Sequence, residues 1–95
     1  MNGWKINKYG TYYKTEHATF TPNTPIKTHY VGPFRSCPVS GVLQPGQTVR
    51  YDTVCKQDDH VWISYTAYNG KDVWLAIRTW DKNTDSLGQL WGTIK

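Results

Sequence analysis

Residues 60–66 read HVWISYT and residues 73–77 read VWLAI, and the turn signal Asn69-Gly70 lies between them. As strands, these runs place Val61, Ile63 and Tyr65 on one face of the first and Val73, Leu75 and Ile77 on one face of the second. Large apolar residues at every second position are typical of strands that bury one face. The dipeptide predicts a hairpin with a type I′ turn, in which both central residues have a positive φ. The second run leaves the ring of Trp74 pointing outward, where a ligand, a loop or a neighbour must cover it.

The rest of the chain continues this pattern of short strands separated by turn residues. Proline, glycine and paired acidic residues interrupt it repeatedly, and no segment has helical periodicity. The expected strands are residues 10–14, 18–21, 26–30, 48–57, 61–68, 72–78 and 90–95, with a second tight connection at Asp58-Asp59. This succession predicts an all-β domain with the architecture of a small barrel or sandwich.

The composition fits one compact domain with a large aromatic content. The chain has 95 residues, of which 38% are hydrophobic and 15% aromatic, with five Trp and seven Tyr against two Phe. Trp and Tyr each join an apolar ring to a polar group, so this bias favours a half-exposed recognition surface as well as a core. We assign residues 4–95 to the domain and residues 1–3 to a linker.

The charge pattern points weakly to a class of partner. The net charge is +4, and the eleven Lys and Arg are scattered without forming a run. This favours anionic partners such as wall polymers, nucleic acid or lipid headgroups, although a solvated basic surface explains it equally well. No apolar run approaches the length of a membrane span and no signal-peptide pattern is present, so we expect no membrane partner.

The two cysteines, Cys37 and Cys55, are too few for a disulfide framework or a cysteine metal site. We expect them to be small buried apolar residues, and a single disulfide between them stays open if their strands adjoin. The sequence contains no His-Glu-x-x-His motif and no other metal-ligand spacing. We therefore expect neither a metal nor a cofactor.

Residues 7–13 read NKYGTYY and combine three tyrosines, two small polar side chains and a glycine. If this segment is a strand, alternation places four side chains on one face: Asn7, Tyr9, Thr11 and Tyr13. Such a face offers flat aromatic walls and hydrogen-bonding groups, without an acid, a base or a nucleophile. It is suited to holding a ligand and not to cleaving one.

The sequence resembles a known family over nearly its whole length. The matching stretches are NKYGT at 7–11, FTPNT at 20–24, GPFRS at 32–36, SGVL at 40–43, HVW at 60–62, RTW at 78–80 and LWGTIK at 90–95. In this order and spacing they are similar to the bacterial SH3-like (SH3b) cell-wall-targeting domains of staphylococcal wall hydrolases and phage endolysins. The resemblance implies a small SH3-like β-barrel with additional strands.

The resemblance also implies a function. It describes a non-catalytic, monomeric module that anchors a covalently linked catalytic domain to staphylococcal peptidoglycan, outside the cell that makes the wall. In this family the domain recognises the pentaglycine cross-bridge in a groove and the peptide stem at a second surface. The groove residues carried over are Asn7, Tyr9, Thr11, Tyr13 and Trp74. The possible second surface comprises Asn23, Thr24, His29, Thr53 and Trp91.

Several positions depart from the family's pattern. Trp74 stands where the family has a tyrosine, which keeps an aromatic wall and enlarges it. Thr53 stands where an acidic residue occurs and His29 where an arginine occurs, both on the second surface. Lys27 replaces an apolar residue near the groove, and both cysteines replace methionines. The glycine groove is therefore better supported than the stem surface.

The chemistry of oligoglycine fits the residues carried over. Because this ligand has no side chains, recognition depends on its backbone N–H and C=O groups and on close packing. A groove narrow enough for glycine rejects larger side chains by steric clash. Flexible glycine loses much entropy on ordering, so we expect a monovalent Kd on the order of micromolar or weaker. Dense repeats in the wall would compensate through avidity.

Three alternative functions stay open from the residues. An enzyme could use a Cys–His pair drawn from His17, His29 or His60, but these residues have no local catalytic motif. The single glutamate, Glu16, has no neighbouring carboxylate for a glycosidase pair. A basic aromatic barrel could also stack single-stranded nucleic acid or bind another extended peptide, such as a proline-rich one. The diffuse charge argues against nucleic acid.

Overall fold

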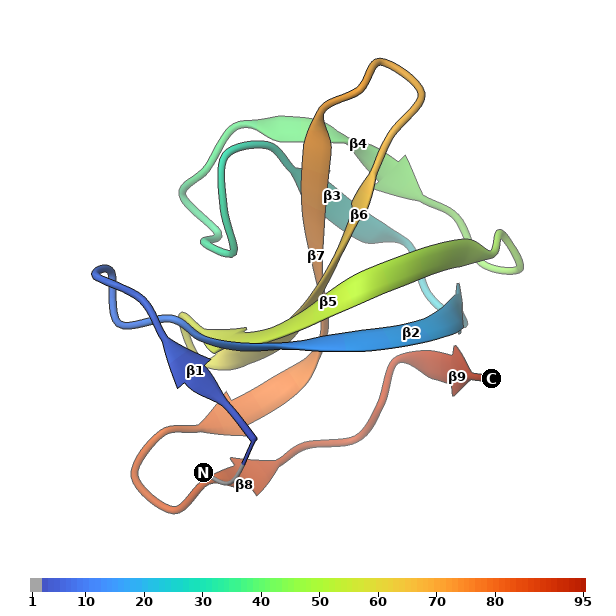
Figure 1. Ribbon diagram of the computed structural model, residues 1–95. Helices are drawn as coiled ribbons and strands as arrows, with labels where there is room; N and C mark the ends of the chain where they lie inside the picture. The colour runs from blue at the N-terminus through green and yellow to red at the C-terminus, as the bar shows by residue number, and fades with distance from the viewer. Residues whose placement is uncertain (1–2) are drawn as a thin grey trace.

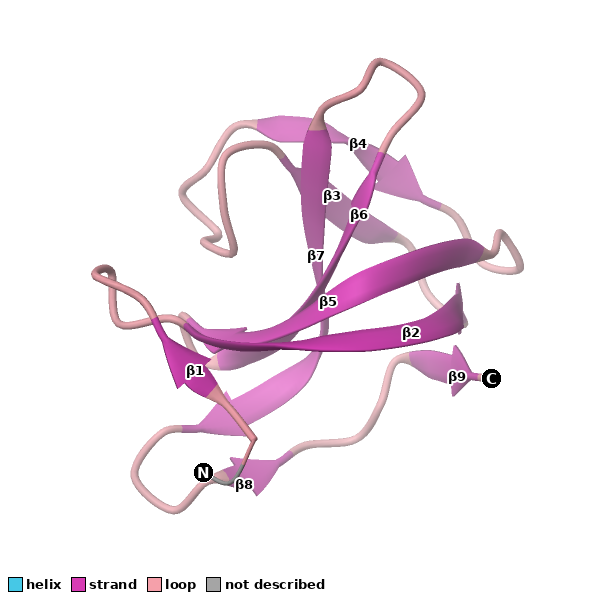
Figure 2. Cartoon of the chain, viewed as in Figure 1, coloured by secondary structure: helices cyan, strands magenta, loops and turns pink. Residues whose placement is uncertain are grey.

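The computed structural model describes residues 3–95, which form nine strands and no helix (Figures 1 and 2). The strands are β1 (Lys5–Ile6), β2 (Tyr12–Pro22), β3 (Ile26–His29), β4 (Val39–Leu43), β5 (Val49–Gln57), β6 (His60–Thr66), β7 (Asp72–Asp81), β8 (Ser86–Leu87) and β9 (Gly92–Ile94). Residues 1 and 2 of the predicted linker lie outside this description. Within it, no helix is long and apolar enough to cross a membrane.

The strands form one bent antiparallel sheet around a single core. The hydrogen-bonded order is β1-β2-β5-β6-β7-β3-β4, with β9 also pairing with β2 and β8 with β7. In Figure 1, β6 and β7 run steeply across the direction of β2 and β5. The largest fully buried side chains are Trp62, Phe20, Ile63 and Leu75. The predicted all-β barrel is confirmed.

The long strand β2 joins two strands that the sequence predicted separately. Its register against β5 shifts between Thr15 and Ala18, where a bulge bends the strand without ending it. β2 begins only at Tyr12, because the preceding residues form the turn that connects it to β1. The sequence missed β1, β4 and β8, which are short strands with mainly exposed or half-buried side chains.

The type I′ turn of this molecule lies at Asp58-Asp59 and not at Asn69-Gly70. Asp58 and Asp59 have φ values of 50° and 61°, and Gln57 pairs with His60 across them. A two-residue loop with two positive φ values is a type I′ turn. The prediction for Asn69-Gly70 is wrong, because among these two residues only Gly70 has a positive φ, of 79°.

Candidate ligand-binding groove

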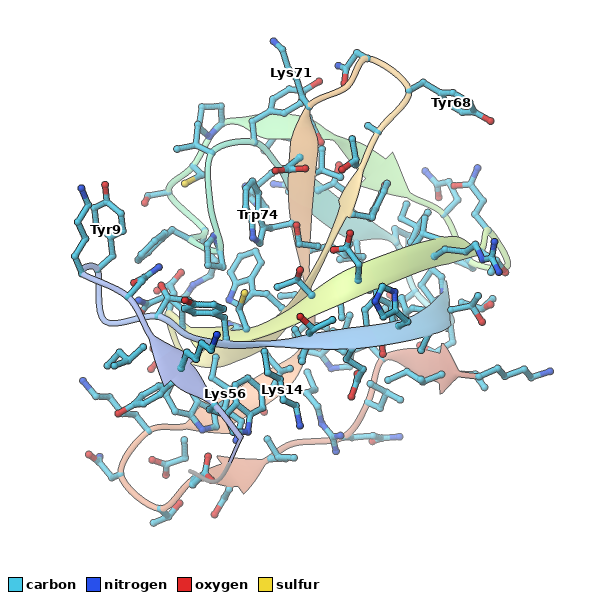
Figure 3. All side chains as sticks on the ribbon, viewed as in Figure 1. Tyr9, Lys14, Lys56, Tyr68, Lys71 and Trp74 are labelled. Carbon is cyan, nitrogen blue, oxygen red and sulfur yellow. The ribbon has the colours of Figure 1, made fainter. Side chains whose placement is uncertain are left out.

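A groove of about 540 Å³ lies between the β1–β2 turn (residues 7–11) and the β3–β4 segment (residues 31–34). Its lining residues are Asn7, Tyr9, Thr11, Tyr13, Val31, Gly32, Pro33, Phe34, Thr53, Cys55 and Trp74. Figure 3 shows Tyr9 on the projecting turn and Trp74 on β7, both on the same side of β2 and β5. The structure therefore brings together all five side chains of the predicted glycine site.

The register of the sheet explains how distant residues meet in this groove. Directly paired residues of antiparallel strands place their side chains on the same face. Tyr13 on β2 pairs with Cys55 on β5. Thr53 on β5 pairs with Ser64 on β6, and Ser64 pairs with Trp74 on β7. The floor of the groove is thus built from two rows of side chains that together cross four strands, β2, β5, β6 and β7.

The β1–β2 turn is a three-residue loop and not the predicted strand. The Asn7 N–H donates to the Thr11 carbonyl at 3.1 Å, and the Gly10 N–H donates to the Asn7 carbonyl at 3.1 Å. Gly10 has a φ of 78°, which a glycine adopts without steric cost. The loop, and not strand alternation, is what places Asn7 and Tyr9 at the groove. Tyr12 leaves the groove and packs edge-on against Trp80.

The polar side chains of Asn7 and Thr11 already have partners within the protein. Asn7 Oδ1 accepts hydrogen bonds from the N–H groups of Tyr9 (2.9 Å) and Thr11 (3.1 Å). The buried Thr11 hydroxyl accepts one from Gln57 Nε2 at 2.9 Å. Within residues 3–95 no hydrogen bond engages Asn7 Nδ2, so this group remains a donor for a ligand. Fewer polar atoms are therefore free to contact a ligand than the side chains alone predicted.

The cysteine in the groove is chemically inert. Burial raises the pKa of the Cys55 thiol to about 12, and a hydrogen bond from Trp74 opposes this rise. A protonated, buried thiol is neither a nucleophile nor a metal ligand. Both cysteines are free, so the disulfide that the sequence left open does not form. Cys55 is buried as predicted, whereas Cys37 is only half-buried.

The residues of the predicted second surface do not all meet in one place. A separate hollow of about 400 Å³ includes Thr24, His29 and Trp91 among its lining residues. Thr53 instead lines the first groove. Asn23 lies on neither lining, and its N–H donates to the Trp91 carbonyl at 3.0 Å.

The hollow with Trp91 also contains two residues that the sequence did not single out as binding residues. These are His60, whose ring centroid lies 5.7 Å from that of Trp91, and Arg35. Both belong to stretches that match the family, which is the signal that could have identified them. His29 is buried there, with Nδ1 2.9 Å from the Cys37 carbonyl oxygen, so it has a structural role.

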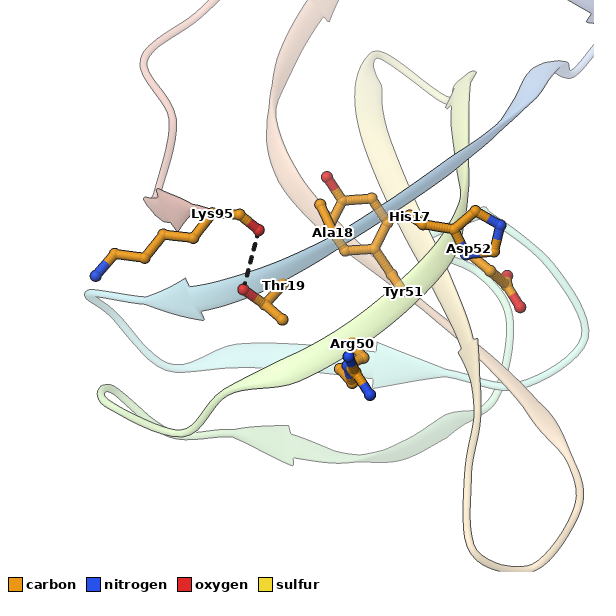
Figure 4. A pocket seen from close by; sticks show the side chains of 7 residues that line it. All are labelled: His17, Ala18, Thr19, Arg50, Tyr51, Asp52 and Lys95. Carbon is orange, nitrogen blue, oxygen red and sulfur yellow. Dashed lines mark hydrogen bonds between the residues drawn. The ribbon is translucent and has the colours of Figure 1, made fainter.

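Another hollow, of about 590 Å³, lies where β2 shifts its register (Figure 4). Figure 4 shows Arg50 and Tyr51 on opposite faces of β5 and the Lys95 side chain extending away. Tyr51 is buried and donates a hydrogen bond to Glu16 at 2.7 Å. These side chains do not converge on a common point. Throughout residues 3–95, no group of His, Cys, Asp and Glu side chains is arranged to hold a metal ion.

A sequence profile of bacterial SH3 domains matches residues 7–77. Lysostaphin of Staphylococcus simulans is 62% identical over 93 residues, and endolysin PlyTW of Staphylococcus phage Twort is 62% identical over 95 residues. Both alignments cover 98% of this chain but only 19% and 20% of the relatives. The chain therefore spans about a fifth of the length of these curated relatives.

Solved structures agree with these sequence relatives. The chain superposes on the lysostaphin SH3b domain in a P4-G5 complex with a TM-score of 0.97 and 62% identity, covering 98% of this chain and 100% of that one. It superposes on the cell wall targeting domain of the peptidoglycan hydrolase ALE-1 with a TM-score of 0.94 and 59% identity, covering 97% and 93%. Both likenesses extend over nearly the whole chain.

Proposed function

Because this chain belongs to the bacterial SH3 domain family, we propose that its groove binds the glycine cross-bridge of staphylococcal-type peptidoglycan. The chain is a cell-wall-targeting SH3b domain and not a catalytic domain, since nearly all of it aligns with the targeting domain of a hydrolase. What is proposed beyond family membership is that this chain binds pentaglycine. The side chains that line its own groove support this step.

The observation that carries this proposal is the absence of charge among the groove's described lining residues. All eleven are uncharged, and five are aromatic or proline: Tyr9, Tyr13, Pro33, Phe34 and Trp74. An oligoglycine segment is likewise uncharged and offers only peptide groups and flat surfaces for contact. A nucleic acid would require cations along its phosphates. The lining thus favours the peptide over the nucleic-acid alternative.

The polar groups of the groove suit a peptide backbone. The Asn7 amide nitrogen offers a donor for a ligand carbonyl, and the Thr11 hydroxyl, which accepts from Gln57, keeps its own proton to donate. The Thr53 hydroxyl donates to the neighbouring Asp52 at 2.9 Å, which leaves its oxygen as an acceptor. Such contacts fix the direction and register of a ligand that has no side chains to read.

We assign the stem peptide to the neighbouring hollow that contains Thr24, Arg35 and Trp91. His29 of this hollow pairs with Trp74 of the groove, so the two sites adjoin across β3 and β7. In this hollow the Trp91 indole offers a flat apolar surface and Thr24 a hydroxyl group, which suit an extended peptide. In the intact protein, the domain would act at the wall outside the producing cell, as a monomer linked to a hydrolase domain.

The experiment that tests the proposal compares three ligands on the 95-residue chain by NMR titration. Pentaglycine should shift the amide signals of residues 7–13 and the Trp74 indole signal. A proline-rich peptide and single-stranded DNA should shift them little. Larger shifts with either of these ligands, or pentaglycine shifts confined to other surfaces, would contradict the proposal.

One variant tests the wall-binding step itself. Trp74→Ala removes the largest ring of the groove, and we expect at least a tenfold loss of affinity for purified peptidoglycan, measured by co-sedimentation. The fold should persist, since Trp74 lies at the surface of the core and is only half-buried. Unchanged sedimentation of a folded Trp74→Ala chain would remove the groove from the binding site.

A further inference from the structure

The tight turn between β5 and β6 does not line the groove, but it contacts both of the segments that form its sides. Gln57, at the end of β5, contacts the β1–β2 turn. Asp58, the next residue, contacts the residue that follows the β3–β4 segment. Neither of these residues belongs to the groove lining. One short turn therefore connects two loops that are far apart in the sequence.

The Gln57 side chain holds the β1–β2 turn through its amide. Its Nε2 donates to the Tyr9 carbonyl at 3.1 Å and to the Thr11 hydroxyl at 2.9 Å. Its Oε1 accepts from the Asp58 N–H at 2.9 Å, which fixes the orientation of the amide. The Gln57 backbone carbonyl accepts from Trp62 Nε1 at 2.8 Å, and Trp62 is fully buried. Gln57 is thus anchored to the buried Trp62 through its backbone and contacts the β1–β2 turn through its side-chain amide.

The Asp58 carboxylate holds the opposite side of the groove through Arg35. Oδ2 accepts from the Arg35 backbone N–H at 2.8 Å and from Nε at 3.0 Å, and Oδ1 accepts from Nη2 at 3.0 Å. The backbone contact fixes the main chain directly after Phe34, which lines the groove. Asp59 makes a single longer contact with Nη2, at 3.5 Å. The carboxylate of Asp58 therefore carries this connection.

We propose that Gln57 and Asp58 are positioning residues that together set the distance between the two sides of the groove. The inference rests on the proposed function, because a fixed width matters for a ligand recognised by its lack of side chains. A type I′ turn is short and strongly constrained, and here it joins two central strands. Loops held in the bound geometry lose little entropy when the ligand binds.

The stabilising effect of these contacts on the fold is a separate matter. The Arg35 side chain is 58% exposed and that of Asp58 is 25% exposed, so solvent weakens their ion pair. We therefore expect variants of the turn to change ligand binding more than the unfolding temperature. This difference separates positioning from a general structural role.

The test uses Gln57→Leu, Asp58→Asn and the matched control Asp59→Asn in the 95-residue chain. Asn tolerates the positive φ of both aspartates, so each Asp variant removes one charge from the same turn. Affinity for pentaglycine should fall about tenfold in Gln57→Leu and Asp58→Asn, and hardly at all in Asp59→Asn. Discrimination against a serine-containing pentapeptide should also fall in the first two variants.

Amide hydrogen exchange should localise the two effects. In Gln57→Leu the amides of Tyr9 and Thr11 should exchange faster, whereas those of Gly32 and Phe34 should change less. In Asp58→Asn the pattern should be reversed. Equal affinities in all variants, or exchange that increases uniformly, would overturn the proposal. If the parent chain does not bind pentaglycine, the proposed function fails, and the crossed exchange pattern still decides whether the turn positions both loops.

Discussion

The β1–β2 turn and the β6–β7 loop (residues 67–71) have the same local geometry and different surroundings. In the second loop the Gly70 N–H donates to the Ala67 carbonyl, and the Ala67 N–H donates to the Lys71 carbonyl, both at 2.9 Å. Residues 7–11 repeat this pattern, and each loop has a glycine in its fourth position with a φ of 78° or 79°. An Asn side chain accepts from a backbone N–H in both.

The two loops differ in what surrounds their tyrosines. Tyr9 is 67% exposed and stands beside the groove, on a loop that Gln57 holds. Tyr68 is fully exposed at the tip of its loop and projects into solvent (Figure 3). The β6–β7 loop contacts its surroundings through Tyr30, by a 3.3 Å hydrogen bond from Asn69 and a cation–π contact with Lys71. The same loop geometry therefore places a tyrosine beside a groove only where a second wall faces the loop.

The largest expected difference between the loops concerns their tyrosines. Tyr9→Ala should weaken sedimentation with purified peptidoglycan by about tenfold or more, because it removes an aromatic wall. Tyr68→Ala removes an even more exposed ring from the matching loop and should leave binding unchanged. Equal losses in the two variants would show that exposed tyrosines bind the wall without a groove.

The glycines of the loops should separate stability from binding. Neither Gly10 nor Gly70 has an atom within 4 Å of the position of an added Cβ, so Gly10→Ala and Gly70→Ala introduce backbone strain alone. Each should lower the free energy of unfolding by about 1 kcal/mol, measured by chemical denaturation. Only Gly10→Ala should also weaken pentaglycine binding. A binding loss in Gly70→Ala would contradict this division.

The opposite wall of the groove contains a strained residue. Val31 has a φ of 80°, is 77% exposed, and lies between Tyr30 and Gly32, whose carbonyl and N–H form a 3.0 Å hydrogen bond. This is a γ-turn conformation that a β-branched residue rarely adopts. Val31→Gly should therefore raise the free energy of unfolding by about 1 kcal/mol while weakening pentaglycine binding.

The control for that prediction is Val31→Ala, which keeps the strain and removes most of the side chain. It should weaken binding without the gain in stability. If Val31→Gly is destabilised, or binds pentaglycine as well as the parent chain, the strained valine has no role in the groove.

The smallest expected effect is on the pH dependence of stability. The hydrogen bond from Arg35 holds the pKa of Asp58 below its ordinary range, and burial opposes this only partly. A depressed pKa stabilises the fold above the unfolded-state value of about 3.9, and that contribution is lost as the pH falls through the folded-state value. The unfolding temperature should therefore decline less steeply below about pH 4 in Asp58→Asn. An identical decline in both chains would contradict the assignment.

Local sequence rules predicted much of the fold and part of the site. The alternating runs located β6 and β7 and the inward face of β7, because period-2 patterns follow from strand geometry. β6 is instead buried on both faces, since Trp62 and Ser64 lie inside as well. The turn types were less predictable: Asp58-Asp59 adopts the I′ geometry that Asn69-Gly70 was expected to have. Gly70 favours a positive φ, but whether its neighbour follows depends on how the strands around the loop pair.

The five groove residues were identified through the family resemblance. The strand alternation that first grouped four of them was wrong. Asn7 and Tyr9 reach the groove from a loop, whereas Thr11 and Tyr13 reach it from the chain that leads into β2 and from β2 itself. The β3–β4 wall and Gln57 were not anticipated. Both depend on contacts between residues more than 20 positions apart, such as the 48-residue separation between Gln57 and Tyr9.

The sequence by itself determined an all-β domain with aromatic recognition chemistry and no catalytic group, because composition and alternation are local properties. It did not determine the shape of residues 7–11, which strand alternation predicted as extended and which the structure closes into a loop. Only the tertiary structure decided that this loop faces a second wall, and that the matching loop at 67–71 does not. The register of β5 and the turn that follows it brought both walls together, and no local rule specifies such long-range pairing.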